Sequence, residues 1–233
     1  MIGYHPGVRA MLMRALGEPD RLEPVELPDP EPGPGQISID VQAIGCNFAD
    51  VLLCRGAYQV KPTLPFSPGS EVAGRVRALG DDVQGFVVGQ SVSAAVGFGG
   101  FASIAVADVR RVQAMPEGMP FEHAASFGIA YLTSYLALAD RARLGSNDTL
   151  LVLAAAGGVG LCAVQLGRAL GARVIAGVGS DDKRALTLQH GAHEAVNTRS
   201  EDWPERVREL TGGRGADVIY DSVGGDVFER SLK

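Results

Sequence analysis

The chain has 233 residues, 46% of them hydrophobic, and a formal net charge of −6, so it is long enough for one large domain or two ordinary ones. The negative charge, the lack of a basic run and the lack of an apolar stretch long enough to span a membrane argue against nucleic acid and membrane as partners. Three cysteines without a paired spacing, and an N-terminus without a signal peptide pattern, predict a cytoplasmic protein.

Residues 1–125 are predicted to form a compact domain rich in β-strands. Alternating polar and apolar side chains, or short apolar runs between glycine turns, are typical of strands. Such segments lie at residues 9–15, 24–27, 36–43, 71–79 and 91–96. A short helix is expected over residues 48–54, and four prolines exclude regular structure between Pro28 and Gly35. Many short strands with little helix favour a β-rich domain.

Residues 126–233 show a different pattern, in which apolar runs alternate with helical segments. Strands are expected at residues 150–153, 173–178, 194–196 and 216–220. Helices are expected from about residue 121, after the first of these strands, and at residues 182–190 and 203–210. Strict alternation predicts a parallel, doubly wound sheet. A full dinucleotide-binding fold has about six strands, so this domain is predicted to be incomplete at its C-terminus.

The apolar run 150–153 leads into the small residues 154–160, and a helical pattern follows at once. This order of strand, tight turn and helix opens a dinucleotide-binding unit, in which the helix N-terminus faces a pyrophosphate. In the register of the glycine fingerprint, Ala155, Gly157 and Gly160 occupy the three glycine positions. The residues expected to bind the cofactor at this turn are Gly157, Gly158, Val159 and Gly160.

The end of the second strand of such a unit separates NAD from NADP, because an acidic residue there binds the ribose 2′-hydroxyl of NAD. That position falls near Val178, where the sequence has no acid. Ser180 as a hydrogen-bond donor and Lys183 as a cation favour a 2′-phosphate, so NADPH is the expected cofactor. Asp181 and Asp182 weaken this argument unless they cap a helix, and an ordinary surface turn is the alternative.

Five motifs carry a family resemblance that covers nearly all of the chain from about residue 10. They are 43–50 (AIGCNFAD), 55–58 (RGAY), 68–74 (PGSEVAG), 154–160 (AAAGGVG) and 221–225 (DSVGG). Together they resemble the medium-chain dehydrogenase/reductase superfamily, and more closely its zinc-free, ζ-crystallin-like NADPH:quinone oxidoreductases. The resemblance implies an α/β protein with a GroES-like catalytic domain at 1–125 and a partial, NADP-binding Rossmann domain at 126–233. It also implies that the complete protein can form a homodimer.

The resemblance bears on metal binding as well. Alcohol dehydrogenases of this superfamily hold a catalytic zinc through a cysteine and a histidine in two of these motifs. The matching residues here are Asn47 and Ser70, and Cys46 lies one residue away from the ligand position. The sequence has no four-cysteine lobe for a structural zinc, and its histidines share no ligand spacing. We therefore expect no metal.

The family implies a reaction in which NADPH donates a hydride to a quinone or a related electron-poor carbonyl. Carried over by motif, Asn47 and Asp50 line the nicotinamide end of the site, and Tyr58 donates a hydrogen bond or a proton to the substrate oxygen. Thr133 and Val223 are expected at the cofactor. Tyr58 has an alternative role as an anchoring aromatic, and Thr133 has one as a helix threonine bonded to its own backbone.

Two residues depart from the family pattern. Leu52 and Thr198 stand where relatives commonly carry tyrosines, and the second change weakens or removes a contact near the adenosine phosphate. Arg55 is expected to pair with Asp50 or a neighbouring carboxylate and to hold its loop. Two other functions stay open: a 2-enoyl thioester or enone reductase on the same scaffold, and a relative that binds the nucleotide without catalysis.

Overall fold

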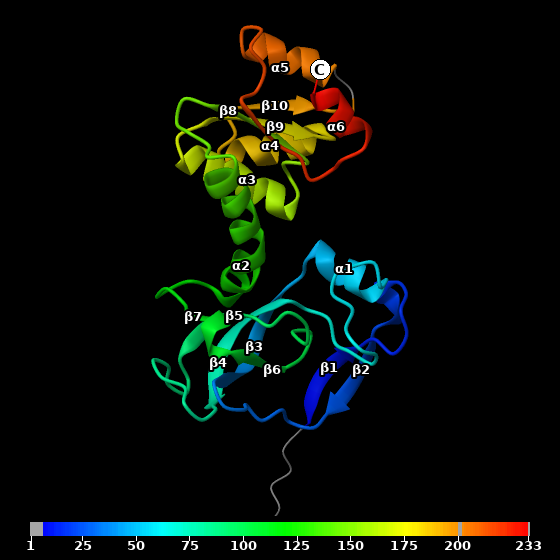
Figure 1. Cartoon of the computed structure of the whole chain (residues 1–233), viewed down its shortest axis with the longest axis vertical. Coiled ribbons are helices and arrows are strands. Elements are labelled where there is room, and N and C mark those ends of the chain that lie inside the picture. Colours follow the sequence, from blue (N-terminus) through cyan, green and yellow to red (C-terminus); the bar gives the residue numbers. More distant parts are fainter. Residues whose placement is uncertain (1–6, 200–201, 233) are drawn as a thin grey trace, which may run out of the picture. The chain divides into compact units, whose positions relative to one another are not determined.

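A computed structural model describes residues 7–199 and 202–232 of the chain (Figure 1). The chain divides into two compact units, residues 1–129 and 130–233, and each unit has its own sheet. The dividing point lies inside helix α2 (Phe121–Tyr135). No helix in the described part of the chain is both long and apolar enough to cross a membrane.

The first unit is built on an antiparallel sheet of five strands in the order β6-β3-β4-β5-β7. These strands are β3 (Gln36–Gly45), β4 (Glu71–Leu79), β5 (Ser91–Ala95), β6 (Ile104–Asp108) and β7 (Val112–Ala114). A separate antiparallel pair and a helix complete it: β1 (Val8–Leu12), β2 (Glu23–Leu27) and α1 (Phe48–Cys54). Short 3₁₀ turns lie at Pro19–Arg21 and Val109–Arg111.

Alternation along the strands determines the core of the first unit. Ile37 and Ile39 of β3 point to the same face, and both are fully buried. They join a cluster of small aliphatic side chains from β4, β5, β6 and β7. The strand pair β3–β4 is the longest in this sheet, and its register places Gly45 opposite Glu71. This register positions the polar cluster described below.

The second unit contains a parallel sheet of four strands in the order β10-β9-β8-β11. The strands are β8 (Thr149–Leu153), β9 (Arg173–Val178), β10 (Glu194–Asn197) and β11 (Val218–Tyr220). The helices are α3 (Gly158–Ala169), α4 (Asp181–Gln189), α5 (Trp203–Leu210) and α6 (Asp226–Ser231), and a π-helical turn covers Leu136–Arg141. In Figure 1, α3 and α4 lie on one side of the strands and α5 lies on the other.

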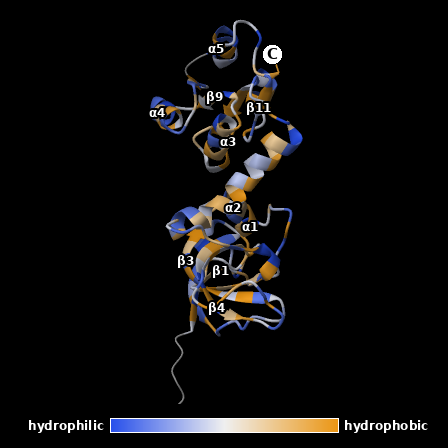
Figure 2. Ribbon diagram, turned by 90° about the vertical axis from the view of Figure 1, so that its left-hand side faces the viewer, coloured by the Kyte–Doolittle hydropathy of each residue, from blue (hydrophilic) through white to orange (hydrophobic). Residues whose placement is uncertain are grey.

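Every residue of β8 is buried, because both faces of this parallel sheet are covered. Leu150 and Val152 pack on one face with side chains of α3, and Leu151 and Leu153 pack on the other with side chains of α5. Hydrophilic residues occupy part of the surface of α4 and α5, as expected for helices with one face against a sheet (Figure 2). The predicted doubly wound parallel sheet is confirmed.

The predicted β-rich first part is also confirmed, with differences at individual strands. The expected helix 48–54 and strand 71–79 match α1 and β4 at both ends. The first expected strand, 9–15, is wrong in extent, since β1 ends at Leu12. Strands β6 and β7 were not predicted, because the apolar run of β6 lacks clear alternation and β7 has only three residues.

Candidate active site

The glycine turn joins β8 to α3 at the carboxyl end of the parallel sheet, where such sheets bind ligands. The N–H of Gly157 donates a hydrogen bond to the carbonyl of Ala154 (2.9 Å), and Gly157 is the N-cap of α3. Gly157 and Gly158 are both exposed, so the first turn of the helix is accessible from outside. The amides of this turn can therefore meet an anionic ligand.

The turn differs in one detail from the fingerprint register. Ala155 is fully buried, and its N–H donates to the carbonyl of Gly177, which continues the pairing of β8 with β9. The left-handed residue of the turn is Ala154, with φ of +51°. The sharp change of chain direction therefore falls one residue earlier than the first glycine position of the fingerprint.

The three glycines of the turn differ in whether the surrounding protein leaves room for a side chain. A Cβ at Gly160 would lie 2.3 Å from the carbonyl oxygen of Ala154, so the close packing of α3 on β8 requires glycine there. A Cβ at Gly157 would lie 3.3 Å from the same oxygen. A Cβ at Gly158 would meet no protein atom within 4 Å. The space beside Gly158 is free to admit a ligand against the backbone, and this fits the phosphates of a dinucleotide.

Ser134 of α2 connects three elements around this turn and was not identified from the sequence. Its side chain is completely buried. Its hydroxyl donates to the carbonyl of Val159 (2.8 Å) and lies 3.2 Å from the hydroxyl of Tyr220 at the end of β11. Thr133, the predicted cofactor contact, is the exposed neighbour of Ser134 on the same helix.

Ser180 and Lys183 lie beyond the end of β9, where the ribose of a dinucleotide is expected. Ser180 is the N-cap of α4, partly buried and in an extended conformation. Lys183 is exposed in the first turn of that helix. Asp181 and Asp182 form the first turn of α4, where acidic side chains favour the helix dipole. This position gives the two acids a role in stabilising the start of α4 that does not involve a cofactor.

Val223 lies in the turn after β11. The carboxylate of Asp221 accepts hydrogen bonds from the N–H groups of Val223 (2.7 Å) and Gly224 (3.2 Å). This side-chain-stabilised turn leaves the Val223 side chain 53% exposed. β8 and β11 are hydrogen-bonded neighbours, so the turn that follows β11 belongs to the same edge of the sheet as the glycine turn.

In the first unit, Asp50 is the centre of a buried hydrogen-bond cluster. Its carboxylate is only 4% exposed and accepts from the N–H of Asn47 (2.8 Å), the N–H of Gly69 (3.2 Å) and the hydroxyl of Ser70 (3.0 Å). Asn47 is the N-cap of α1, and Ser70 immediately precedes β4. The two residues that match zinc-ligand positions are thus brought to one carboxylate. Through these hydrogen bonds, Asp50 fixes the positions of Asn47 and Ser70.

Glu71 is a second buried carboxylate in this cluster, and the sequence did not identify it. One oxygen accepts from the side-chain amide of Asn47 (2.9 Å), and the other accepts from the N–H of Ile129 (2.9 Å). The pairing of Gly45 with Glu71 brings these groups together. A Cβ at Gly45 would lie 2.3 Å from the carbonyl oxygen of Ala125 and 2.5 Å from the Glu71 side chain, so this close approach requires glycine.

The electrostatics of Glu71 follow from its burial. Loss of solvent raises the pKa of the Glu71 carboxyl above its ordinary value, and hydrogen bonds from Asn47, Ile129 and Gly128 oppose that rise. The carboxylate of Asp50 adds to the rise. Partial desolvation by neighbouring groups, together with the same Asp50 charge, also raises the pKa of the thiol of Cys46, an exposed residue, and favours its neutral form.

Tyr58 and Arg55 lie after α1. The ring of Tyr58 packs, half-buried, against the cluster formed by Met13, Leu53, Cys54 and Phe66. Arg55 forms a bidentate ion pair with Glu18, with a shortest N–O distance of 2.7 Å, and not with Asp50. The predicted role of Arg55 in holding the loop therefore has a different carboxylate as its partner.

Among residues 7–199 and 202–232, no group of three or more His, Cys, Asp or Glu side chains is arranged to hold an ion. Asn47 and Ser70 offer an amide and a hydroxyl where a zinc site of this type needs a thiolate and an imidazole.

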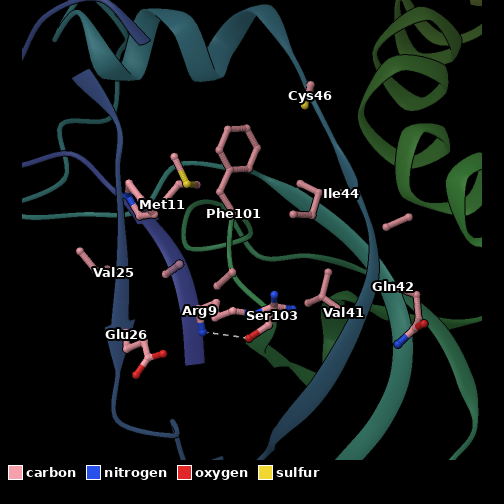
Figure 3. A pocket seen from close by; sticks show the side chains of 14 residues that line it. Arg9, Met11, Val25, Glu26, Val41, Gln42, Ile44, Cys46, Phe101 and Ser103 are labelled. Carbon is pink, nitrogen blue, oxygen red and sulfur yellow. Dashed lines mark hydrogen bonds between the residues drawn. The ribbon is translucent and has the colours of Figure 1, made fainter. Parts of the chain in front are cut away.

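A cavity of about 800 Å³ lies elsewhere in the first unit, between the β1–β2 pair and β3 (Figure 3). Met11, Ile44 and Phe101 point into it, and a hydrogen bond from the Arg9 N–H to the Ser103 hydroxyl (3.0 Å) closes one part of its wall. The lining is mainly apolar and contains none of the predicted catalytic residues. This cavity is therefore separate from the polar cluster around Asp50.

Comparison with known proteins gives two family matches. Residues 33–117 match the alcohol dehydrogenase GroES-like domain, and residues 158–233 match the zinc-binding dehydrogenase family. The chain is 39% identical to the mouse quinone oxidoreductase-like protein 2 over 97% of this chain and 64% of that protein. It is 41% identical to a quinone oxidoreductase of Pseudomonas aeruginosa over 94% of this chain and 67% of that protein. The chain thus spans about two thirds of the length of these relatives.

Three solved structures are similar over nearly the whole chain. The Escherichia coli quinone oxidoreductase complexed with NADPH has a TM-score of 0.88 and 35% identity, over 96% of this chain and 69% of that one. An NAD-dependent alcohol dehydrogenase has a TM-score of 0.92 and 34% identity, over 96% and 73%. The CurK enoyl reductase has a TM-score of 0.89 and 29% identity, over 97% and 70%. The expected GroES-like and Rossmann parts of the fold are confirmed.

Proposed function

This chain belongs to the quinone oxidoreductase family of the medium-chain dehydrogenase/reductase superfamily, and on this basis we propose that it is an NADPH-dependent reductase of quinones or related electron-poor carbonyls that acts without zinc. The three free cysteines suit a reducing compartment, so we place the protein in the cytoplasm.

The observation that carries the proposal is the open space beside Gly158. The chain itself does not require glycine at this residue, because a Cβ there would touch nothing within 4 Å. The residue is exposed at the N-terminus of α3, where amides and the helix dipole favour phosphate. A ligand that lies against the backbone at this point supplies the missing reason for the glycine.

The cofactor is held, in this proposal, by the second unit. Gly157, Gly158 and Val159 present the first turn of α3 to the pyrophosphate, while Gly160 keeps that helix close to β8. Thr133 and Val223 contribute exposed groups, and Ser180 and Lys183 receive the 2′-phosphate. When bound, NADPH supplies the hydride.

The first unit contributes residues that orient the reacting groups. Asn47 presents the free part of its amide, and Glu71 fixes the orientation of that amide. Asp50 holds the backbone of Asn47 and the hydroxyl of Ser70 from inside the unit. The hydroxyl of Tyr58 donates a hydrogen bond or a proton to the substrate oxygen. None of these residues requires a metal to act as a hydrogen-bond donor or acceptor.

A second candidate function is the reduction of enones or 2-enoyl thioesters. The similarity to the CurK enoyl reductase supports it. The residues proposed here to hold NADPH would serve both reactions. In each of them the acceptor molecule takes a hydride from NADPH while negative charge develops on its oxygen. The rate of NADPH oxidation with quinones, enones and acyl thioesters as acceptors separates the two functions.

Titration of the chain with NADPH and with NADH, followed by nicotinamide fluorescence, tests the proposal directly. Tight binding of NADPH with weak binding of NADH is the expected result. Equal binding of the two would contradict the role of Ser180 and Lys183, and tighter binding of NADH would favour the cofactor named for the NAD-dependent relative. Absence of binding of either nucleotide would exclude the reductase function for this chain.

A further inference from the structure

We infer that Arg199 is a specificity-determining residue that, together with Ser180 and Lys183, binds the 2′-phosphate of the cofactor and so selects NADPH over NADH. This inference rests on the proposed function, since it concerns the same cofactor. Arg199 follows β10 and was not among the predicted site residues. Its position was not visible in the sequence, because it depends on how β10 pairs with β9.

The strand pairing places Arg199 beside the end of β9. β10 runs parallel to β9, with Asn197 opposite Val178. Beyond this pair, both the N–H and the hydroxyl of Thr198 donate to the carbonyl of Val178, at 2.8 and 3.1 Å. The backbone after β10 is thus bonded to the last residue of β9, where a dinucleotide-binding fold places the ribose 2′-position.

The backbone of Arg199 is fixed as well. Its N–H donates to the side-chain oxygen of Asn197 (3.0 Å), and Asn197 is 6% exposed. A buried side chain therefore determines the direction in which Arg199 leaves the strand. An arginine with a fixed starting point loses less freedom when it binds a phosphate than one on a mobile loop.

The side chain of Arg199 lies across Gly179. A Cβ at Gly179 would be 3.1 Å from Arg199 Nε and 3.5 Å from Arg199 Cζ. Gly179 directly precedes Ser180, the N-cap of α4. The guanidinium therefore reaches the same end of β9 as the two residues that the sequence assigned to the 2′-phosphate.

Charge at this edge favours a phosphate. Within residues 7–199 and 202–232, no carboxylate forms an ion pair with Arg199 or Lys183. Of the two acids in the first turn of α4, Asp181 pairs with Arg184 (3.6 Å), and Asp182 is exposed. A planar guanidinium binds two phosphate oxygens at once, which the ammonium of Lys183 cannot do. A 2′-hydroxyl carries no charge and gains little from either cation.

The test measures the affinity of the chain for 2′,5′-ADP and for 5′-AMP by calorimetry, in the wild type and in Arg199→Gln. These probes differ only by the 2′-phosphate. We expect Arg199→Gln to weaken 2′,5′-ADP binding about tenfold or more and 5′-AMP binding less than about twofold, since a charge-assisted hydrogen bond is lost only with the first ligand. A preserved ratio of the two affinities would overturn the inference.

Two further variants sharpen the result. Gly179→Ala places a methyl group against Arg199 Nε, so it should displace the guanidinium and reduce the same ratio while Arg199 is still present. Arg214→Gln is the matched control. Arg214 lies near the first residues of β8 and β9, at the amino-terminal ends of the strands, whereas Arg199 lies at their carboxyl ends. This variant should leave both affinities unchanged.

The outcomes also separate this inference from the proposed function. If the wild type binds both probes and Arg199→Gln weakens both equally, the role in specificity is wrong while nucleotide binding stands. If the wild type binds neither probe nor NADPH, the proposed function and this inference both fail. Loss of the preference for 2′,5′-ADP in Arg199→Gln and in Gly179→Ala, with Arg214→Gln unchanged, supports the inference.

Discussion

The side-chain amide of Asn47 donates a 2.9 Å hydrogen bond to the carboxylate of Glu71, which lies 24 residues further along the chain. Because an ionised carboxylate only accepts hydrogen bonds, this contact assigns the NH₂ group of Asn47 to Glu71 and turns its carbonyl oxygen away. The second oxygen of Glu71 is used by the backbone of α2. Glu71 is therefore a positioning residue for Asn47.

Replacing Glu71 by glutamine should lower catalysis more than stability. Glutamine has one accepting oxygen, so it cannot serve the amide of Asn47 and the N–H of Ile129 together. We expect kcat for quinone reduction by NADPH to fall about tenfold, which corresponds to about 1.4 kcal/mol. Glu122→Gln, an exposed change on α2, is the control. An unchanged kcat in Glu71→Gln would remove the positioning role.

Glu71 also predicts a pH dependence with opposite signs for stability and activity. Because burial raises its folded-state pKa, the contribution of Glu71 to stability is complete below its ordinary value of 4.5 and is lost as pH rises through the raised pKa. Activity should instead be lost as pH falls through that pKa, since protonation removes an acceptor. Activity and melting temperature measured from neutral pH down to 4.5 test this. The acid limb should be absent in Glu71→Gln.

The glycine turn offers a pair of variants that separates folding from cofactor binding. Gly160→Ala drives a methyl group against the carbonyl of Ala154 and should cost about 1–3 kcal/mol of stability. Gly158→Ala meets no protein atom, so the melting temperature should stay the same or rise slightly. Its affinity for NADPH should fall about tenfold or more. Unchanged NADPH affinity in Gly158→Ala would contradict the proposed position of the pyrophosphate.

Neighbouring residues on α2 make a second pair. Ser134→Ala removes a completely buried hydroxyl together with its hydrogen bond to the carbonyl of Val159, and should cost about 1 kcal/mol, measured by denaturant unfolding. Thr133→Ala changes an exposed residue and should leave stability within about 0.5 kcal/mol. It should weaken NADPH binding, as expected of a cofactor contact. Full NADPH affinity in Thr133→Ala would restrict the role of this helix segment to packing.

Tyr58→Phe separates chemistry from packing at the first unit. The ring that contacts the Met13–Phe66 cluster is kept and only the hydroxyl is removed, so the melting temperature should not change. Loss of a proton donor should lower kcat about a hundredfold, at the lower end of general acid catalysis. A variant with full activity would identify Tyr58 as an anchoring aromatic.

Local patterns were enough to predict much of this fold. Local patterns gave α1, β4, β9 and α5 with correct limits, and a glycine lies one or two residues beyond an end of each. The order of strands and helices also predicted the parallel sheet. The π-helical turn at Leu136–Arg141 left no sequence signal, since its residues fit an ordinary helical pattern.

The candidate site was only partly accessible from the sequence, because its missing members depend on long-range register. Glu71 meets Asn47 through the pairing of β3 with β4, and Arg199 meets Gly179 through the pairing of β10 with β9. Ser134 contacts residues 25 and 86 positions away. A fingerprint identifies backbone positions within one short segment, and it carries no information about which distant side chains complete them.

Ala154 adopts a left-handed conformation at the candidate cofactor turn, which costs an L-residue with a Cβ roughly 1–2 kcal/mol. Glycine would adopt this conformation without that penalty, although it would also widen the unfolded ensemble. The strain at Ala154 and the extra freedom that glycine would give the unfolded chain thus act in opposite directions on stability. For protein engineering, Ala154 is a position where backbone strain can be released without disturbing the core, since the residue is exposed.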